Sequence, residues 1–133
     1  MNSLTKRPKI LVIDDDILLI KLARNILLQN GYEVITAEEA PLGLEMAMKN
    51  KPDLIVLDVM MPIINGFNIC RLLKSEESYR HIPIVLLTSR TGEEDHKIGK
   101  EAGADAYLAK PLNSSELLGK VKELLGKRNI EAS

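Results

Sequence analysis

Carboxylate, hydroxyl and ammonium groups stand at the ends of four short apolar stretches of this sequence. They are Asp14 with Asp15, then Asp58, Thr88 and Lys110. Carboxylates that share one cleft repel each other and raise their own pKa values, and a hard divalent cation such as Mg2+ removes this conflict. A lysine offers a compact positive charge to a phosphoryl oxygen, and a threonine hydroxyl can donate to another. Together, these groups suit nucleophilic attack on phosphorus to give an aspartyl phosphate.

Taken singly, each of these residues has an ordinary structural interpretation. A carboxylate can cap a helix or a loop, a threonine can end a strand in a turn, and a lysine before a proline can lie at the surface. We interpret Asp16, next to the acidic pair, as a helix cap rather than a metal ligand. The case for a site therefore depends on whether the fold brings the five residues together.

Apolar runs and amphipathic stretches alternate five times along the chain. The runs predict buried strands over residues 9–13, 32–36, 54–58, 84–87 and 106–109. The other stretches predict helices over residues 17–30, 38–50, 67–75 and 93–102 and from 113 onward. This alternation predicts an α/β fold, a doubly wound five-stranded parallel sheet with helices on both faces. Right-handed crossovers would place all the strand carboxyl ends, and the five polar residues, at one edge.

The last two predicted helices differ in their expected stability. The helix over residues 93–102 has few apolar residues and contains Gly99, which costs about 1 kcal/mol relative to alanine in a helix interior. The final helix begins with a capping pattern, Asn113 followed by Glu116, and has a continuous apolar stripe. We therefore expect the fourth helix to be the least stable, which suits an element that must switch.

Composition excludes several classes of protein. A length of 133 residues predicts one domain, and a net charge of -1 gives no electrostatic basis for binding nucleic acid or an acidic membrane. No apolar run could span a bilayer or serve as a signal peptide. Cys70 is the only cysteine, so no internal disulfide forms, and a zinc site lacks ligands at suitable spacing. We expect a cytoplasmic protein.

Four motifs resemble the receiver domain of bacterial two-component response regulators. They are Ile13-Asp14-Asp15, Leu57-Asp58-Val59-Met60-Met61-Pro62 with Gly66, Leu87-Thr88-Ser89, and Tyr107-Leu108-Ala109-Lys110-Pro111. The resemblance covers about residues 8 to 126 and places the motifs in the order and spacing of that family. It implies a flavodoxin-like (βα)5 fold with strand order 2-1-3-4-5, as in the chemotaxis receiver protein.

The resemblance assigns the acidic residues to phosphorylation. It implies that Asp58 is the phosphoacceptor. It also implies that Asp14, Asp15 and Asp58 hold Mg2+, for which Mn2+ can substitute, together with the backbone carbonyl of Met60.

The remaining motif residues are implied to bind the phosphoryl group and to respond to it. Thr88 and Lys110 would bind phosphoryl oxygens, and a cis peptide would join Lys110 to Pro111. Thr88 and Tyr107 would be the switch pair: Thr88 moves toward the phosphoryl group, and Tyr107 turns to fill the vacated space. This change would bias a surface formed by the fourth helix, the fifth strand and the fifth helix.

Two variable positions of the family should set the lifetime of the phosphorylated state. Met60 stands two residues after Asp58, and Arg90 two residues after Thr88. We hypothesise that these bulky side chains shield the phosphoryl group from an in-line water and slow its loss.

The implied function is a phosphorelay switch rather than an enzyme. A histidine kinase or histidine phosphotransfer protein would donate the phosphoryl group, and an output protein or domain would read it, with a homodimer on activation as a further option. The domain would span residues 1–126, and residues 127–133 would be a tail or the start of a linker.

Three alternative functions fit these residues less well. A haloacid dehalogenase-type phosphatase needs an acid-base aspartate where this chain has Met60. A flavodoxin needs a hydroxyl-rich phosphate loop after the first strand, where this chain has three acids. A metal-independent pseudo-receiver used only for docking would not need the intact set of Asp14, Asp15, Thr88 and Lys110.

Overall fold

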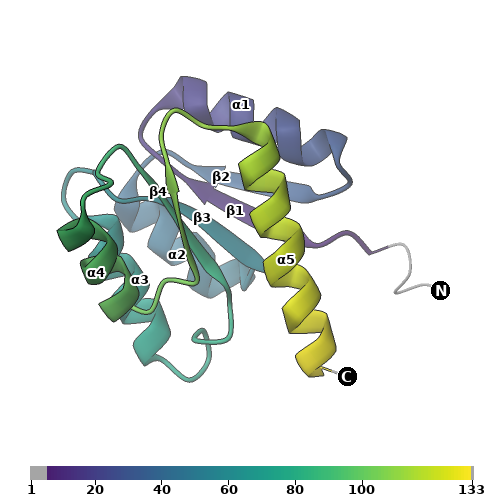
Figure 1. Ribbon diagram of the computed structural model, residues 1–133. Coiled ribbons are helices and arrows are strands. Elements are labelled where there is room, and N and C mark those ends of the chain that lie inside the picture. The colour runs from purple at the N-terminus through teal and green to yellow at the C-terminus, as the bar shows by residue number, and fades with distance from the viewer. Residues whose placement is uncertain (1–5, 133) are drawn as a thin grey trace.

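Five strands alternate with five helices in the computed structural model, which describes residues 6–132 (Figure 1). The strands are β1 (Lys9–Ile13), β2 (Glu33–Ala37), β3 (Leu54–Asp58), β4 (Ile84–Thr88) and β5 (Ala106–Ala109). The helices are α1 (Ile17–Gln29), α2 (Ala40–Asn50), α3 (Gly66–Ser75), α4 (Glu93–Glu101) and α5 (Ser114–Ala132). Within the described range, none of these helices has the length and apolar character needed to cross a membrane.

The strands form one parallel sheet in the order β2-β1-β3-β4-β5, which confirms the predicted fold. In this register Asp58 at the end of β3 pairs with Leu87 of β4, and Thr88 pairs with Ala109, the residue before Lys110. The carboxyl ends of β3, β4 and β5 therefore meet at the same edge of the sheet.

Successive residues of each strand face two separate cores. Ile10, Val12, Leu54 and Val56 belong to the core with α1 and α5, whereas their neighbours Leu11, Ile13, Ile55 and Leu57 belong to the core with α2, α3 and α4. Figure 1 shows α1 and α5 on one side of the sheet and the other three helices on the opposite side. Because both faces are covered, the central strands β1, β3 and β4 each carry four consecutive apolar residues, as is usual for parallel sheets.

Helix starts fix the two loops that carry the acidic residues. The carboxylate of Asp16 accepts hydrogen bonds from the amides of Leu18 and Leu19 and caps α1, as predicted. At the start of α3, the amide of Gly66 donates to the carbonyl of Val59 over 2.9 Å. A Cβ atom on Gly66 would lie 2.9 Å from the Cα of Val59, so only glycine lets α3 approach the end of β3 this closely.

The C-terminal segment differs from the prediction. Residues 127–132, expected to be a tail or the start of a linker, continue α5 as far as Ala132. This stretch has no proline, and Lys127 pairs with Glu123 one turn earlier over 3.7 Å, so nothing in the local sequence ends the helix. The other predicted bounds differ from the structure by at most two residues.

Candidate functional site

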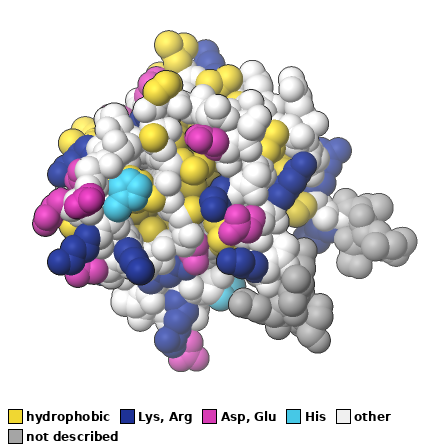
Figure 2. Space-filling model, viewed as in Figure 1, with side chains coloured by type: hydrophobic (Ala, Val, Ile, Leu, Met, Phe, Trp, Pro, Cys, Tyr) yellow, Lys and Arg dark blue, Asp and Glu magenta, His cyan; other side chains and the backbone are white. Residues whose placement is uncertain are grey.

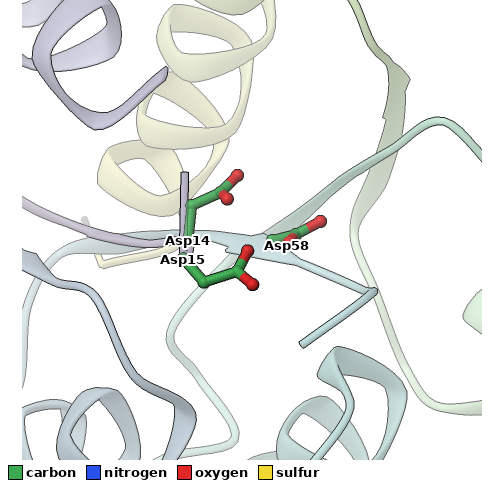
Figure 3. A group of neighbouring side chains, drawn as sticks. All are labelled: Asp14, Asp15 and Asp58. Carbon is green, nitrogen blue, oxygen red and sulfur yellow. The ribbon is translucent and has the colours of Figure 1, made fainter. Parts of the chain in front are cut away.

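Three carboxylates converge at the carboxyl edge of the sheet. Asp14 and Asp15 follow β1, Asp58 ends β3, and one oxygen from each lies within 4.8 Å of the others (Figure 3). Asp14 and Asp58 are only 1% and 3% exposed, whereas Asp15 is exposed. The site is therefore a partly enclosed acidic pocket with one open side.

Lys110 is the cation of this pocket. Its Nζ atom lies 3.0 Å from Oδ2 of Asp14 and 3.3 Å from Oδ1 of Asp58. The loop after β5 delivers this side chain, and the peptide bond between Lys110 and Pro111 is cis. Asp14 and Lys110, which are 96 positions apart in the chain, thus meet because β1 and β5 end at the same edge of the sheet.

Burial and charge set the protonation of the pocket. Burial, followed by the negative charge of Asp14, raises the pKa of Asp58 to about 6, although the charge and hydrogen bond of Lys110 oppose this rise. Desolvation lowers the pKa of Lys110, but the hydrogen bond and charge of Asp14 and the charge of Asp58 outweigh it, so this pKa is raised. Lys110 therefore stays protonated and partly neutralises the two buried acids.

The pocket fits a hard divalent cation. Oδ2 of Asp14 is buried, and the ammonium of Lys110 is the cation beside it, at 3.0 Å. The only side-chain ligands that Asp14, Asp15 and Asp58 offer are carboxylate oxygens, which Mg2+ and Mn2+ prefer over sulfur or imidazole nitrogen. One lysine faces three carboxylates here, so a divalent cation would offset the excess negative charge.

Thr88 and Tyr107 are connected through Arg90. Thr88 is fully buried, and its Oγ1 accepts a hydrogen bond of 3.1 Å from the amide of Arg90. The hydroxyl of Tyr107 donates to the carbonyl of the same residue. Burial, and next the charge of Asp95, raise the pKa of Tyr107. The predicted switch residues are thus linked through one backbone segment after β4, and Tyr107 does not line the acidic pocket.

Met60 and Arg90 meet beside the pocket. Nη1 of Arg90 lies 3.7 Å from the sulfur of Met60, and Nη2 lies 2.7 Å from Oδ1 of Asp95 in the first turn of α4. The ion pair with Asp95 was not predicted. No sequence pattern indicates this ion pair, because its formation depends on the path of the loop between β4 and α4.

An apolar groove opens next to Lys110. It has a volume of about 490 Å³ and is lined by Asp16, Leu18, Leu19, Leu22, Ser89, Lys110, Pro111 and Leu112. Leu18, on α1, is 77% exposed, and Leu22 one turn later is also exposed. This surface joins the mouth of the pocket to an exposed apolar patch.

Comparison with known proteins identifies the family. The sequence profile of the response regulator receiver domain matches residues 10–122, so the chain belongs to this family. It is therefore a receiver domain, the signalling domain of two-component systems, and the resemblance of its motifs is confirmed.

Similar proteins agree with this assignment. The response regulator PleD of Caulobacter vibrioides is 43% identical over 116 residues, which are 87% of this chain and 26% of PleD. The alkaline phosphatase synthesis transcriptional regulatory protein PhoP of Bacillus subtilis is 40% identical over 93% of this chain and 51% of its own length. The chain thus spans about a quarter to a half of these relatives.

Solved structures share the fold. A putative response regulator from Chloroflexus aurantiacus superimposes with a TM-score of 0.86 at 34% identity, covering 91% of this chain and 99% of that one. The chemotaxis protein CheY4 of Vibrio cholerae gives a TM-score of 0.84 at 34% identity, covering 90% and 99%.

Proposed function

We propose that this receiver domain accepts a phosphoryl group on Asp58 from a histidine kinase or histidine phosphotransfer protein, in a reaction that requires Mg2+. The observation that supports this most is the buried Asp58 with Asp14, Asp15 and Lys110 around it. A carboxylate oxygen of Asp58 attacks phosphorus, the bond from phosphorus to the donor nitrogen breaks, and the electron pair leaves with the imidazole. We place this reaction in the cytoplasm.

The residues of the pocket have distinct roles in this reaction. Lys110 and the hydroxyl of Thr88 bind oxygens of the transferred group, and Lys110 neutralises the charge that develops on them. Asp14, Asp15, Asp58 and the carbonyl of Met60 would hold the Mg2+ ion, which would supply further neutralisation of the phosphoryl oxygens.

The groove beside Lys110 is where we place the donor protein. The donor must bring a phosphohistidine to the acidic pocket, and Leu18 offers an exposed apolar contact in the groove that Lys110 also lines. Replacing Leu18 with serine should slow phosphotransfer from a phosphohistidine protein but leave phosphorylation by acetyl phosphate unchanged.

The output is a change of the surface formed by α4, β5 and α5, through Thr88 and Tyr107. Figure 2 shows side chains of both charges interspersed over the face that carries α4 and α5, a surface suited to specific contacts with an output partner or a second copy. We take residues 1–126 as the receiver unit and assign no substrate turnover to it.

Intact-mass measurement tests the proposal. The protein is incubated with acetyl phosphate, with and without Mg2+, as wild type and as Asp58→Ala. We expect one added phosphoryl group, only with Mg2+ and only in the wild type. Lys110→Ala should slow the reaction about 100-fold, whereas Lys120→Ala, on α5, should not. No added mass under any condition would contradict the proposal and favour a pseudo-receiver that only docks.

A further inference from the structure

The ring of Tyr107 is held against α4 and the loop that precedes it. Its hydroxyl donates a hydrogen bond to the carbonyl of Arg90. Its ring centroid lies 4.2 Å from that of His96, on α4, with the two planes tilted by 34°. A third contact comes from Gly99, one turn further along the helix, which is buried beneath the ring. All three contacts define one position of Tyr107.

Gly99 leaves the space that this position requires. A Cβ atom at residue 99 would lie 2.9 Å from Cδ2 of Tyr107 and 3.0 Å from Cε2, which is too close for carbon atoms. The same Cβ would lie 3.3 Å from a methyl group of Leu86, which is tight but can be relieved by a small shift. Any residue larger than glycine therefore displaces the ring of Tyr107.

The backbone conformation at residue 99 does not require a glycine. Residue 99 lies within α4, where the helical conformation is open to every residue and alanine is favoured over glycine. Gly119, in α5, provides a contrast, because nothing lies within 4 Å of a Cβ atom placed there. Gly99 is buried and faces the ring of Tyr107, whereas Gly119 is exposed and faces open space.

We propose that Gly99 is a positioning residue: it admits the Tyr107 ring to its place against α4 and so sets the balance between the two positions of Tyr107 in the switch. The first part concerns the unphosphorylated protein and stands on the contacts above. The second part rests on the proposed function, because it assigns the movement of Tyr107 to the phosphorylation response.

Thermal unfolding tests the steric relation. Gly99→Ala and Gly119→Ala are compared in the wild type and in a Tyr107→Ala background. Both gain helix propensity, but we expect Gly99→Ala to raise the Tm less than Gly119→Ala, or to lower it, when Tyr107 is present. This deficit should disappear in the Tyr107→Ala background. An equal effect of the two substitutions, or a deficit that persists without Tyr107, would overturn the proposal.

The position of the ring can be read directly. In NMR spectra of protein with ring-labelled tyrosine, the Tyr107 signals are assigned by their absence in Tyr107→Phe, and the nearby His96 ring shifts them. We expect Gly99→Ala to remove this shift and Gly119→Ala to keep it. An unchanged shift in Gly99→Ala would show that the ring has not moved and would overturn the proposal.

The switch part is tested with the Mg2+-dependent phosphorylation by acetyl phosphate. We expect Gly99→Ala to gain the phosphoryl group but to lose the accompanying amide shift changes in α4 and β5, which Gly119→Ala keeps. Changes as large as in the wild type would overturn this part. If the wild type itself gains no phosphoryl group, the proposed function fails, whereas the unfolding and ring-shift measurements still decide the role of Gly99.

Discussion

Among single residues, Asp58 is an acid of the pocket whose environment works against its charge. Its pKa is raised from an ordinary value of 3.8 to about 6, chiefly by burial. Between these two values the folded protein binds more protons than the unfolded chain. The stability of the metal-free protein should therefore fall as pH rises through this window. Above about pH 6, the ionised carboxylate of Asp58 lowers the stability of the folded protein. A bound cation would remove this unfavourable contribution.

The first prediction follows from this fall in stability with rising pH. In the presence of EDTA, Asp58→Asn should unfold at about the same urea concentration as wild type near pH 4 and be more stable by about 2 kcal/mol at pH 8. Urea unfolding at a series of pH values measures the difference. A difference that does not change with pH would show that Asp58 carries no shifted titration.

A second residue-scale prediction concerns Met60 and Arg90, whose side chains meet beside the pocket. If they exclude water from the line of attack, replacing both with alanine should shorten the lifetime of the phosphorylated protein by about tenfold, since water then reaches phosphorus freely. The decay of the phosphorylated mass after removal of acetyl phosphate measures this lifetime. Leu72→Ala, an exposed residue of α3, is the control. An unchanged decay rate would contradict the shielding hypothesis.

Among the elements, α3 is linked to β4 and β5 by a half-buried lysine. Nζ of Lys74 donates to the carbonyls of Arg80 and Ile82 and pairs with Asp105 over 2.8 Å. The same carboxylate accepts the amide of Ile84 at the start of β4. Lys74 thus joins the end of α3 to the starts of β4 and β5.

Removal of this lysine should therefore loosen three elements together. We expect Lys74→Met to lower the free energy of unfolding by about 2 kcal/mol, because the partly buried carbonyl of Ile82 and the carboxylate of Asp105 lose their donor. Lys120→Met removes only an ion pair at the surface, so it should change the free energy of unfolding by less than about 0.5 kcal/mol. Chemical denaturation of both variants makes the comparison. Equal effects would mean that the Lys74 contacts add nothing to stability.

Helix α4 should be the least protected helix. Its one buried residue within the helix is Gly99, which contributes no side chain to the core, whereas α1 buries Leu19, Ile20, Ala23 and Leu27. Few buried apolar contacts permit local opening at low free energy. Native-state hydrogen exchange should show faster exchange in α4 than in α1. Equal protection of the two would contradict this prediction.

At the scale of the whole molecule, the three carboxylates couple folding to metal binding. The unfolded chain does not bring Asp14, Asp15 and Asp58 together, so on the proposed function Mg2+ would bind the folded state alone. At a concentration ten times the Kd, Mg2+ should raise the free energy of unfolding by about 1.4 kcal/mol. Asp15→Asn should reduce this gain. Asp16→Asn keeps a good helix cap outside the cluster and should retain the gain.

Thermal unfolding with and without Mg2+ measures this coupling in the three proteins. Equal stabilisation of Asp15→Asn and wild type would mean that the ion binds elsewhere.

The sequence by itself determined the fold class and the members of the acidic pocket. Strands covered on both faces are apolar throughout, and right-handed crossovers bring their carboxyl ends to one edge, so Asp14, Asp15, Asp58 and Lys110 could be expected to meet. The cap at Asp16 was predictable for a similar reason, because a cap is a local interaction. The sequence did not indicate that residues 127–132 continue α5, since weak helix signals after residue 126 resemble those of a tail.

Only the tertiary structure decided the contacts between loops and between helices and strands. The sequence shows Gly99 as a weak point of a helix, but the structure shows a glycine that makes room for Tyr107 from another element. In the same way, the pairing of Arg90 with Asp95 depends on the path of the loop between β4 and α4. Such contacts follow from the packing of whole elements, which periodicity in the sequence does not encode.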